Sequence, residues 1–173
     1  EIAVNEDAAT AAVVFKTVVD PFIGKLTFVK VVAGKLTADS PVINMRTGEQ
    51  ERMIKMYYMC GKKQEETKCI CAGDIGAIPK LQHTNTGDTL CSPTRKVVLE
   101  GVTYPEPVLS MAILPKQKGE EDKVAQGVLR LLEEDPTLKF VNNAETHQMI
   151  LSGLGEQHLD VVVSKLKGKF GLD

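Results

Sequence analysis

The 173-residue chain is long enough for one large domain or two small ones. Apolar residues make up 43% of it and charged residues 25%, which excludes global disorder, and there is no apolar run of the ~18 residues that a membrane span needs. The net charge of −2 excludes a surface that is basic throughout, so any contact with RNA would have to come from local patches.

Residues 1–100 are predicted to form a β-barrel. Ala11–Val19 and Leu26–Val32 are rich in Val, Phe and Thr, the residue types that favour strands. Turn signals follow at short intervals, at Gly24, Gly34, Thr47-Gly48, Gly61, Gly73 and Thr86-Gly87-Asp88. Many short strands separated by such turns are typical of a barrel or sandwich.

A proline-containing stretch, residues 92–107, is predicted to connect two domains. Proline fixes φ and lacks a backbone donor, which makes Pro93, Pro105 and Pro107 unsuited to the middle of a sheet. The chain begins at Glu1 without a Met and ends at Asp173 just after an amphipathic run, so we expect an excised piece of a longer protein.

Residues 101–173 change to a helical period. Val108–Leu114 is a predicted strand, and Glu120–Asp135 is a predicted helix with Val124, Val128, Leu131 and Leu132 on one face. Leu138–Val141 and Gln148–Leu151 are predicted to form a hairpin around a turn at Asn142–Glu145. A second helix, Glu156–Lys169, carries Leu159, Val162, Val163, Leu166 and Phe170 on one face. The order β-α-β-β-α predicts a ferredoxin-like α/β sandwich that lacks its last strand.

The sequence offers no set of residues for catalysis. It contains no G-x-x-x-x-G-K-[ST] phosphate loop, so phosphoryl transfer is not expected. Gly153-Leu154-Gly155 could bind an anion at a helix start, but a structural turn is the simpler interpretation. His158 lies two residues from Glu156 and from Asp160, which is a poor spacing for an acid–base pair on a helix, and we expect it at the surface or an interface.

The four cysteines do not predict a metal centre. Cys69 and Cys71 would share one face of a strand, but a site would also need Cys60, Cys91 or His83. Small buried thiols that stay reduced are the preferred interpretation.

Several ordered segments resemble domains II and III of elongation factor G. In the first half they are Asp20-Pro21-Phe22-Ile23-Gly24-Lys25, Ala72-Gly73-Asp74-Ile75-Gly76 and Thr86-Gly87-Asp88-Thr89-Leu90. In the second half they are Pro105-Glu106-Pro107-Val108, Glu134-Asp135-Pro136 and Ser152-Gly153-Leu154-Gly155-Glu156-Gln157-His158-Leu159. The resemblance covers roughly residues 11–173 and implies a translation-factor β-barrel followed by a ferredoxin-like domain.

The resemblance implies a non-catalytic, ribosome-binding fragment of a cytoplasmic translational GTPase. GTP and Mg²⁺ would bind the parent protein and not this fragment, and the partners would be ribosomal RNA and proteins, the GTPase domain and the distal domains, with no membrane. Lys25, Lys62 and Lys63 lie in predicted turns and are the expected RNA contacts. Alternatives are a fragment of a ribosomal protection or recycling paralogue, or a free-standing RNA-binding barrel.

The resemblance also implies one side of a drug pocket. In the family, fusidic acid binds between the GTPase domain and domain III. The matching positions in this sequence are Pro105, Pro107, His158 and Val162.

Overall fold

The computed structural model describes residues 2–20, 24–61, 63–143 and 148–172. The chain divides into two compact units, Glu1–Val102 and Thr103–Asp173, against a predicted division between residues 100 and 101.

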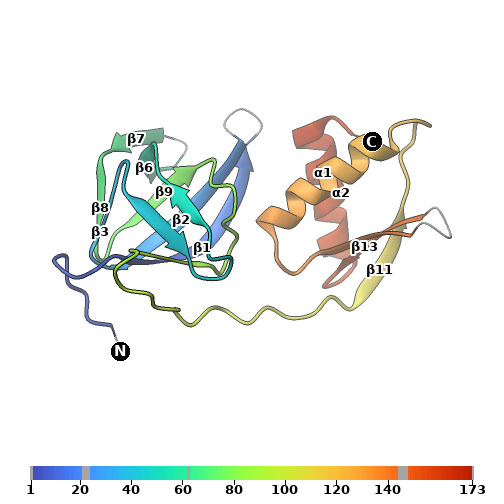
Figure 1. Cartoon of the computed structure of the whole chain (residues 1–173). Helices are drawn as coiled ribbons and strands as arrows, with labels where there is room; N and C mark the ends of the chain where they lie inside the picture. The colour runs from blue at the N-terminus through green and yellow to red at the C-terminus, as the bar shows by residue number, and fades with distance from the viewer. Residues whose placement is uncertain (1, 21–23, 62, 144–147, 173) are drawn as a thin grey trace. The chain divides into compact units, whose positions relative to one another are not determined.

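The first unit is built from strands alone in its described part. Eight of them form one curled antiparallel sheet in the order β5-β4-β10-β1-β2-β9-β6-β7 (Figure 1). Their bounds are β1 Ala11–Asp20, β2 Gly24–Ala33, β4 Pro41–Asn44, β5 Gln50–Arg52, β6 Met56–Cys60, β7 Lys63–Thr67, β9 Ile75–Pro79 and β10 Thr89–Cys91. Two more, β3 (Lys35–Thr37) and β8 (Cys69–Cys71), form a separate antiparallel pair.

Alternation along these strands forms the barrel core. Val14 in β1 and Val29 and Val31 in β2 are fully buried, and their neighbours face outward. Leu36 of β3 and Ile70 of β8 pair across their ladder and enter the same core, so the two-stranded sheet packs on the eight-stranded one. This confirms the predicted β-barrel.

The second unit has two helices on one face of a three-stranded sheet (Figure 1). Its elements are β11 Leu109–Ile113, α1 Glu121–Glu134, β12 Lys139–Asn143, β13 Gln148–Gly153 and α2 Glu156–Phe170. The sheet order β11-β13-β12 is the 1-3-2 part of a ferredoxin-like sheet, in which a fourth strand would lie beside β11. This confirms the predicted α/β fold.

The core of the second unit is apolar. Val128 and Leu131 from α1 meet Leu159, Val162 and Leu166 from α2. A Leu buried in this way contributes about 1.5–3 kcal/mol, so a small unit depends strongly on few side chains.

Two details of the predicted second unit are wrong. Val163 does not join the apolar face of α2: its side chain is 51% exposed, because Leu159, Val162 and Leu166 form a narrower stripe. Asn142 and Asn143 belong to strand β12 and not to the turn, since they pair with Met149 and Gln148. Ala144 and Glu145, the rest of the predicted turn, lie outside the described residues.

Candidate nucleic-acid interface

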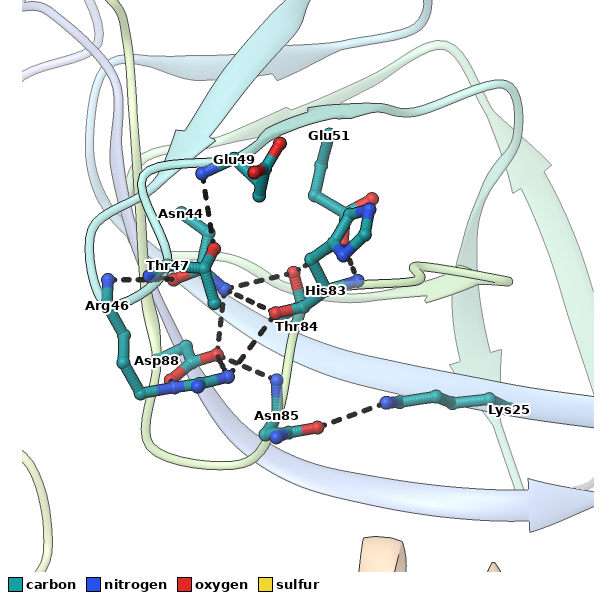
Figure 2. Close-up of polar contacts among 10 residues, drawn as sticks. All are labelled: Lys25, Asn44, Arg46, Thr47, Glu49, Glu51, His83, Thr84, Asn85 and Asp88. Atoms are coloured by element: carbon teal, nitrogen blue, oxygen red, sulfur yellow. Dashed lines mark hydrogen bonds and ion pairs between the residues drawn. The ribbon is translucent and has the colours of Figure 1, made fainter.

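Two nearly buried carboxylates organise one loop of the barrel, residues 82–88 (Figure 2). Glu51 comes from β5, and Asp88 lies just before β10, so both are fixed by strands. Both positions face inward, where a charge is tolerated only if it is paired or hydrogen-bonded.

Glu51 holds the start of this loop. Its Oε1 accepts hydrogen bonds from the backbone N–H of His83 at 2.7 Å and from the Thr84 hydroxyl at 2.9 Å. Its Oε2 accepts the N–H of Gln82 at 3.3 Å. A hydrogen bond to a charged carboxylate is stronger than one to a neutral acceptor. The three bonds to Glu51 therefore fix residues 82–84 in place.

Asp88 holds the end of the loop. Its Oδ2 accepts hydrogen bonds from the Asn85 N–H at 2.8 Å and from Asn44 Nδ2 at 2.8 Å. The Arg46 guanidinium binds both carboxylate oxygens, Nε to Oδ1 at 2.6 Å and one terminal nitrogen to Oδ2 at 3.0 Å. Burial by itself would raise the pKa of Asp88, but the bonds from Arg46, Asn85 and Asn44 outweigh it and leave this pKa below its ordinary value.

A second turn, residues 44–49, is attached to the same cluster. The Asn44 Oδ1 accepts the backbone N–H of Arg46 at 2.9 Å, an Asx turn that directs the arginine towards Asp88. Asn44 Nδ2 also donates to the His83 carbonyl at 3.0 Å. The hairpin between β4 and β5 and the loop 82–88 are therefore held as one rigid polar surface.

This surface presents two cationic side chains. Arg46 is 52% exposed although it binds Asp88, and Lys25 Nζ donates to Asn85 Oδ1 at 3.2 Å (Figure 2). A cation held by neighbours loses less entropy when it binds a phosphate than one that moves freely. The sequence predicts Lys25 from its place in a turn. It does not single out Arg46, although this residue immediately precedes the Thr47-Gly48 turn signal.

The three predicted RNA-contact lysines do not form one described patch. Lys25 lies beside Lys80, which follows β9, since the Lys80 N–H donates to the Lys25 carbonyl. Lys63 lies on the β6–β7 hairpin, beyond Tyr58, whose hydroxyl donates to Asp74 just before β9 begins. Lys25 and Lys63 are thus near opposite ends of β9. Lys62 lies outside the described residues.

Lys63 in this hairpin and Lys55, just before β6, each bind an acidic side chain. Lys63 binds Glu65 at 2.8 Å, and Lys55 binds Glu66 at 3.3 Å. Their positive charge is therefore balanced locally. The contact of Lys63 with RNA stays a prediction.

The proposed drug-pocket positions differ in exposure. Pro105 is exposed, Pro107 is half-buried, and Val162 is only 3% exposed because its side chain packs in the helical core. Val162 could therefore act only by supporting neighbouring residues. Pro107 precedes Val108, whose N–H donates to the Gly153 carbonyl at 3.0 Å. This bond brings the proline segment to the turn that precedes α2.

His158 is partly exposed, and two neighbours hold its ring. Its Nε2 lies 2.9 Å from Asp135 Oδ2, and its Nδ1 accepts the Leu154 N–H at 3.1 Å. Since a backbone N–H can only donate, Nδ1 is the acceptor and Nε2 faces Asp135, so the ring joins the end of α1 to the start of α2. A Cβ added at the neighbouring Gly153 would lie 2.8 Å from Leu159 Cδ2 and 3.1 Å from His158 Nδ1, so a larger residue there would displace both side chains.

Within ranges 2–20, 24–61, 63–143 and 148–172, no group of three or more His, Cys, Asp or Glu side chains is placed to hold a metal ion. The expectation of buried thiols holds only for Cys91. Cys60 is exposed, and Cys69 and Cys71 are half-buried. Across that part of the chain, no helix is both long and apolar enough to cross a membrane.

Family comparisons agree with the two units. The model for elongation factor G domain 2 matches residues 9–93, and the model for elongation factor G domain III matches residues 104–173. The chain belongs to the elongation factor G family. The polar surface around Glu51 and Asp88 thus lies in the part of the chain that matches domain 2, and the His158 contact lies in the part that matches domain III.

A solved structure supports the same relationship. The crystal structure of a protein from Thermus thermophilus superposes with a TM-score of 0.84 at 28% sequence identity. The match covers 96% of this chain and 25% of that one, so the chain spans about a quarter of the solved relative. The two family models that match this chain are those of domain 2 and domain III, and neither of them is a GTPase domain.

Proposed function

We propose that this chain is the part of a translational GTPase that contacts the ribosome during translocation. The observation that carries the proposal is the rigid polar surface of the barrel, which presents Lys25 and Arg46 on a domain of a translation factor. Phosphate contacts of this kind position a protein on nucleic acid without reading its sequence.

The parent protein would divide its work between domains. GTP and Mg²⁺ would bind its GTPase domain, and the α/β unit would transmit changes between that domain and the distal ones. This chain alone would neither bind nor hydrolyse GTP, because phosphoryl transfer needs a phosphate cradle, a lysine and a held magnesium ion. Its partners would be ribosomal RNA and ribosomal proteins in the cytoplasm.

The test measures ribosome affinity of the full-length parent over a range of salt concentrations. The double variant Lys25→Gln/Arg46→Gln should weaken binding and lower the slope of log affinity against log salt by about two, roughly one for each cation that no longer neutralises a phosphate. The matched control is Arg52→Gln/Lys55→Gln, which removes the same charges from residues paired with Asp39 and Glu66.

Because Arg46 also binds Asp88, the single variants are needed as well. Lys25→Gln leaves the Asp88 contacts intact and should lower the slope by about one by itself. A slope that is the same in the wild type, Lys25→Gln and the double variant would reject this surface as an RNA contact. Translocation and GTP hydrolysis on ribosomes, measured in parallel, distinguish a translocase from a recycling or protection paralogue.

A further inference from the structure

Two thiols lie next to each other on the outer face of strand β8. The Sγ atoms of Cys69 and Cys71 are 3.8 Å apart. Ile70 between them is fully buried against Leu36 of β3, which fixes both cysteines on the opposite face. Both are half-buried, so small solutes can reach them, whereas Cys91 is buried.

We propose that Cys69 and Cys71 form a reversible redox pair, which a peroxide oxidises to a disulfide within strand β8. Residues two apart on an extended strand have Cα atoms about 6.6 Å apart, within the range of roughly 4.4–6.8 Å found for disulfides. The Sγ atoms must then approach from 3.8 Å to about 2.05 Å, the length of an S–S bond.

The surroundings of the two thiols favour an oxidation in two successive steps. The hydrogen bond with Cys69 raises the pKa of Cys71, so Cys71 keeps its proton and can donate it to the Cys69 sulfur. The Cys69 thiolate attacks hydrogen peroxide, takes one oxygen as a sulfenic acid and releases hydroxide, which becomes water on protonation. The Cys71 sulfur then attacks the Cys69 sulfur, loses its proton and displaces a second water. Two thiols and one peroxide thus give one disulfide and two waters.

The disulfide should be easily reduced. Its Cα separation is at the upper end of the allowed range, and a strained or accessible disulfide has a higher reduction potential than a structural one. Closing it would also bend β8 and disturb the ladder with β3, in which Cys71 is opposite Lys35 and Cys69 is opposite Thr37. The pair therefore couples oxidation to the shape of this edge of the barrel.

The experiment uses the present chain, reduced and then exposed to hydrogen peroxide, with the remaining thiols alkylated before digestion by trypsin. Cleavage after Lys68 and Lys80 gives the peptide 69–80, which contains Cys69 and Cys71 and no other cysteine. We expect this peptide to become two hydrogens lighter and to lose both alkylation sites. Reduction by a dithiol should restore them.

Variants separate the pair from ordinary thiol oxidation. Cys71→Ser should stop at a sulfenic acid on Cys69 that dimedone captures, and Cys60→Ser, at an exposed single thiol, should leave the disulfide unchanged. Phenylarsine oxide, which bridges two nearby thiols, should bind the wild type one to one and bind neither Cys69→Ser nor Cys71→Ser. The proposal is overturned if peptide 69–80 keeps both alkyl groups while Cys60 is oxidised, or if Cys69 links to another chain instead of to Cys71.

Discussion

The barrel and the α/β unit place their charged groups differently. In the barrel, Glu51 and Asp88 lie almost fully inside and bind the backbone and side chains of one loop. In the α/β unit the core is apolar, and the acidic groups Glu134 and Asp135 at the end of α1 meet Lys165, Lys169 and His158 from α2. Charges therefore shape a loop in one unit and join two packed helices in the other.

This difference predicts which changes each unit tolerates. A buried carboxylate that loses its charge leaves several donors without a strong acceptor, so the barrel should respond to single polar substitutions. The α/β unit should respond most to cavities, because its few apolar contacts carry its stability. The variants below test this contrast, from the largest expected effect to the smallest.

Shortening a core leucine should have the largest effect, in the α/β unit. Leu131→Ala removes a side chain that is 2% exposed, and large-to-small changes at such sites cost about 2–5 kcal/mol. That is a large part of the stability of a unit of this size, at roughly 0.05–0.15 kcal/mol per residue. The helical circular dichroism signal should therefore melt at a lower temperature, since the described helices both belong to this unit.

The control is on the same helix. Leu129→Ala removes a leucine that is 52% exposed, and surface substitutions usually change stability by less than about 0.5 kcal/mol. Equal destabilisation by the two variants would contradict the packing of α1 described above.

Removing one charge should have the next largest effect, in the barrel. Asp88→Asn keeps the shape of the side chain but weakens its bonds to Arg46, Asn44 and Asn85, at an expected cost of about 2–3 kcal/mol. The denaturant midpoint of the barrel measures this cost. Asp39→Asn, at an exposed carboxylate paired with exposed Arg52, should cost less than about 1 kcal/mol.

If Asp88→Asn lowered the free energy of unfolding by no more than Asp39→Asn does, loop 82–88 would not depend on the Asp88 charge. Amide exchange at Asn85, whose N–H donates to Asp88, then gives an independent readout of the same bond.

Acid should weaken both units through a carboxylate of each. Burial would raise the pKa of Asp135, but bonds from Thr137 and His158 outweigh it, and the pKa values of Asp135 and Asp88 both lie below the ordinary value. A lowered folded-state pKa contributes stability above the unfolded-state value of about 3.9, and this stability disappears as pH falls through the folded-state value.

Stability should therefore be constant from neutral pH down to about 5 and fall below about 4. Denaturant melts at several pH values would show the fall, which Asp88→Asn should reduce in the barrel and Asp135→Asn in the α/β unit. The same acid dependence in the wild type and in both variants would assign the loss to other groups.

The sequence predicts the elements of both units well because their periods differ. Val124, Val128 and Leu131 repeat at helical spacing, whereas residues 11–19 are rich in the Val, Phe and Thr that favour strands. It does not reveal the polar surface, because Glu51 contacts residues more than thirty positions away and Arg46 contacts Asp88 across forty-two. Such pairs depend on how β4, β5 and β10 lie in the curled sheet, and no local pattern encodes that.

The cysteine pair could be predicted from the sequence only in part. The alternation of a strand is enough to place Cys69 and Cys71 on one face, but their exposure depends on the position of β8 beside β3. The partner of His158 could not be predicted from local sequence. Its ring contacts Asp135 and not Glu156 or Asp160, which are its neighbours in the sequence.

The smallest expected effect concerns His158 and separates its two bonds. His158→Ala removes the acceptor for the Leu154 N–H and the donor to Asp135, and should cost about 1–2 kcal/mol, as the loss of a helix cap does. In His158→Asn the side-chain oxygen replaces Nδ1 and can still accept from Leu154, so this variant should lose only the bond to Asp135, about 1 kcal/mol. Helical circular dichroism in denaturant measures both. If Asn is no better than Ala, the Leu154 bond contributes nothing measurable, and the histidine acts through Asp135 alone. If Asn restores full stability, the contact between α1 and α2 does not depend on Asp135, and the apolar stripe of Leu159, Val162 and Leu166 is sufficient to orient the two helices.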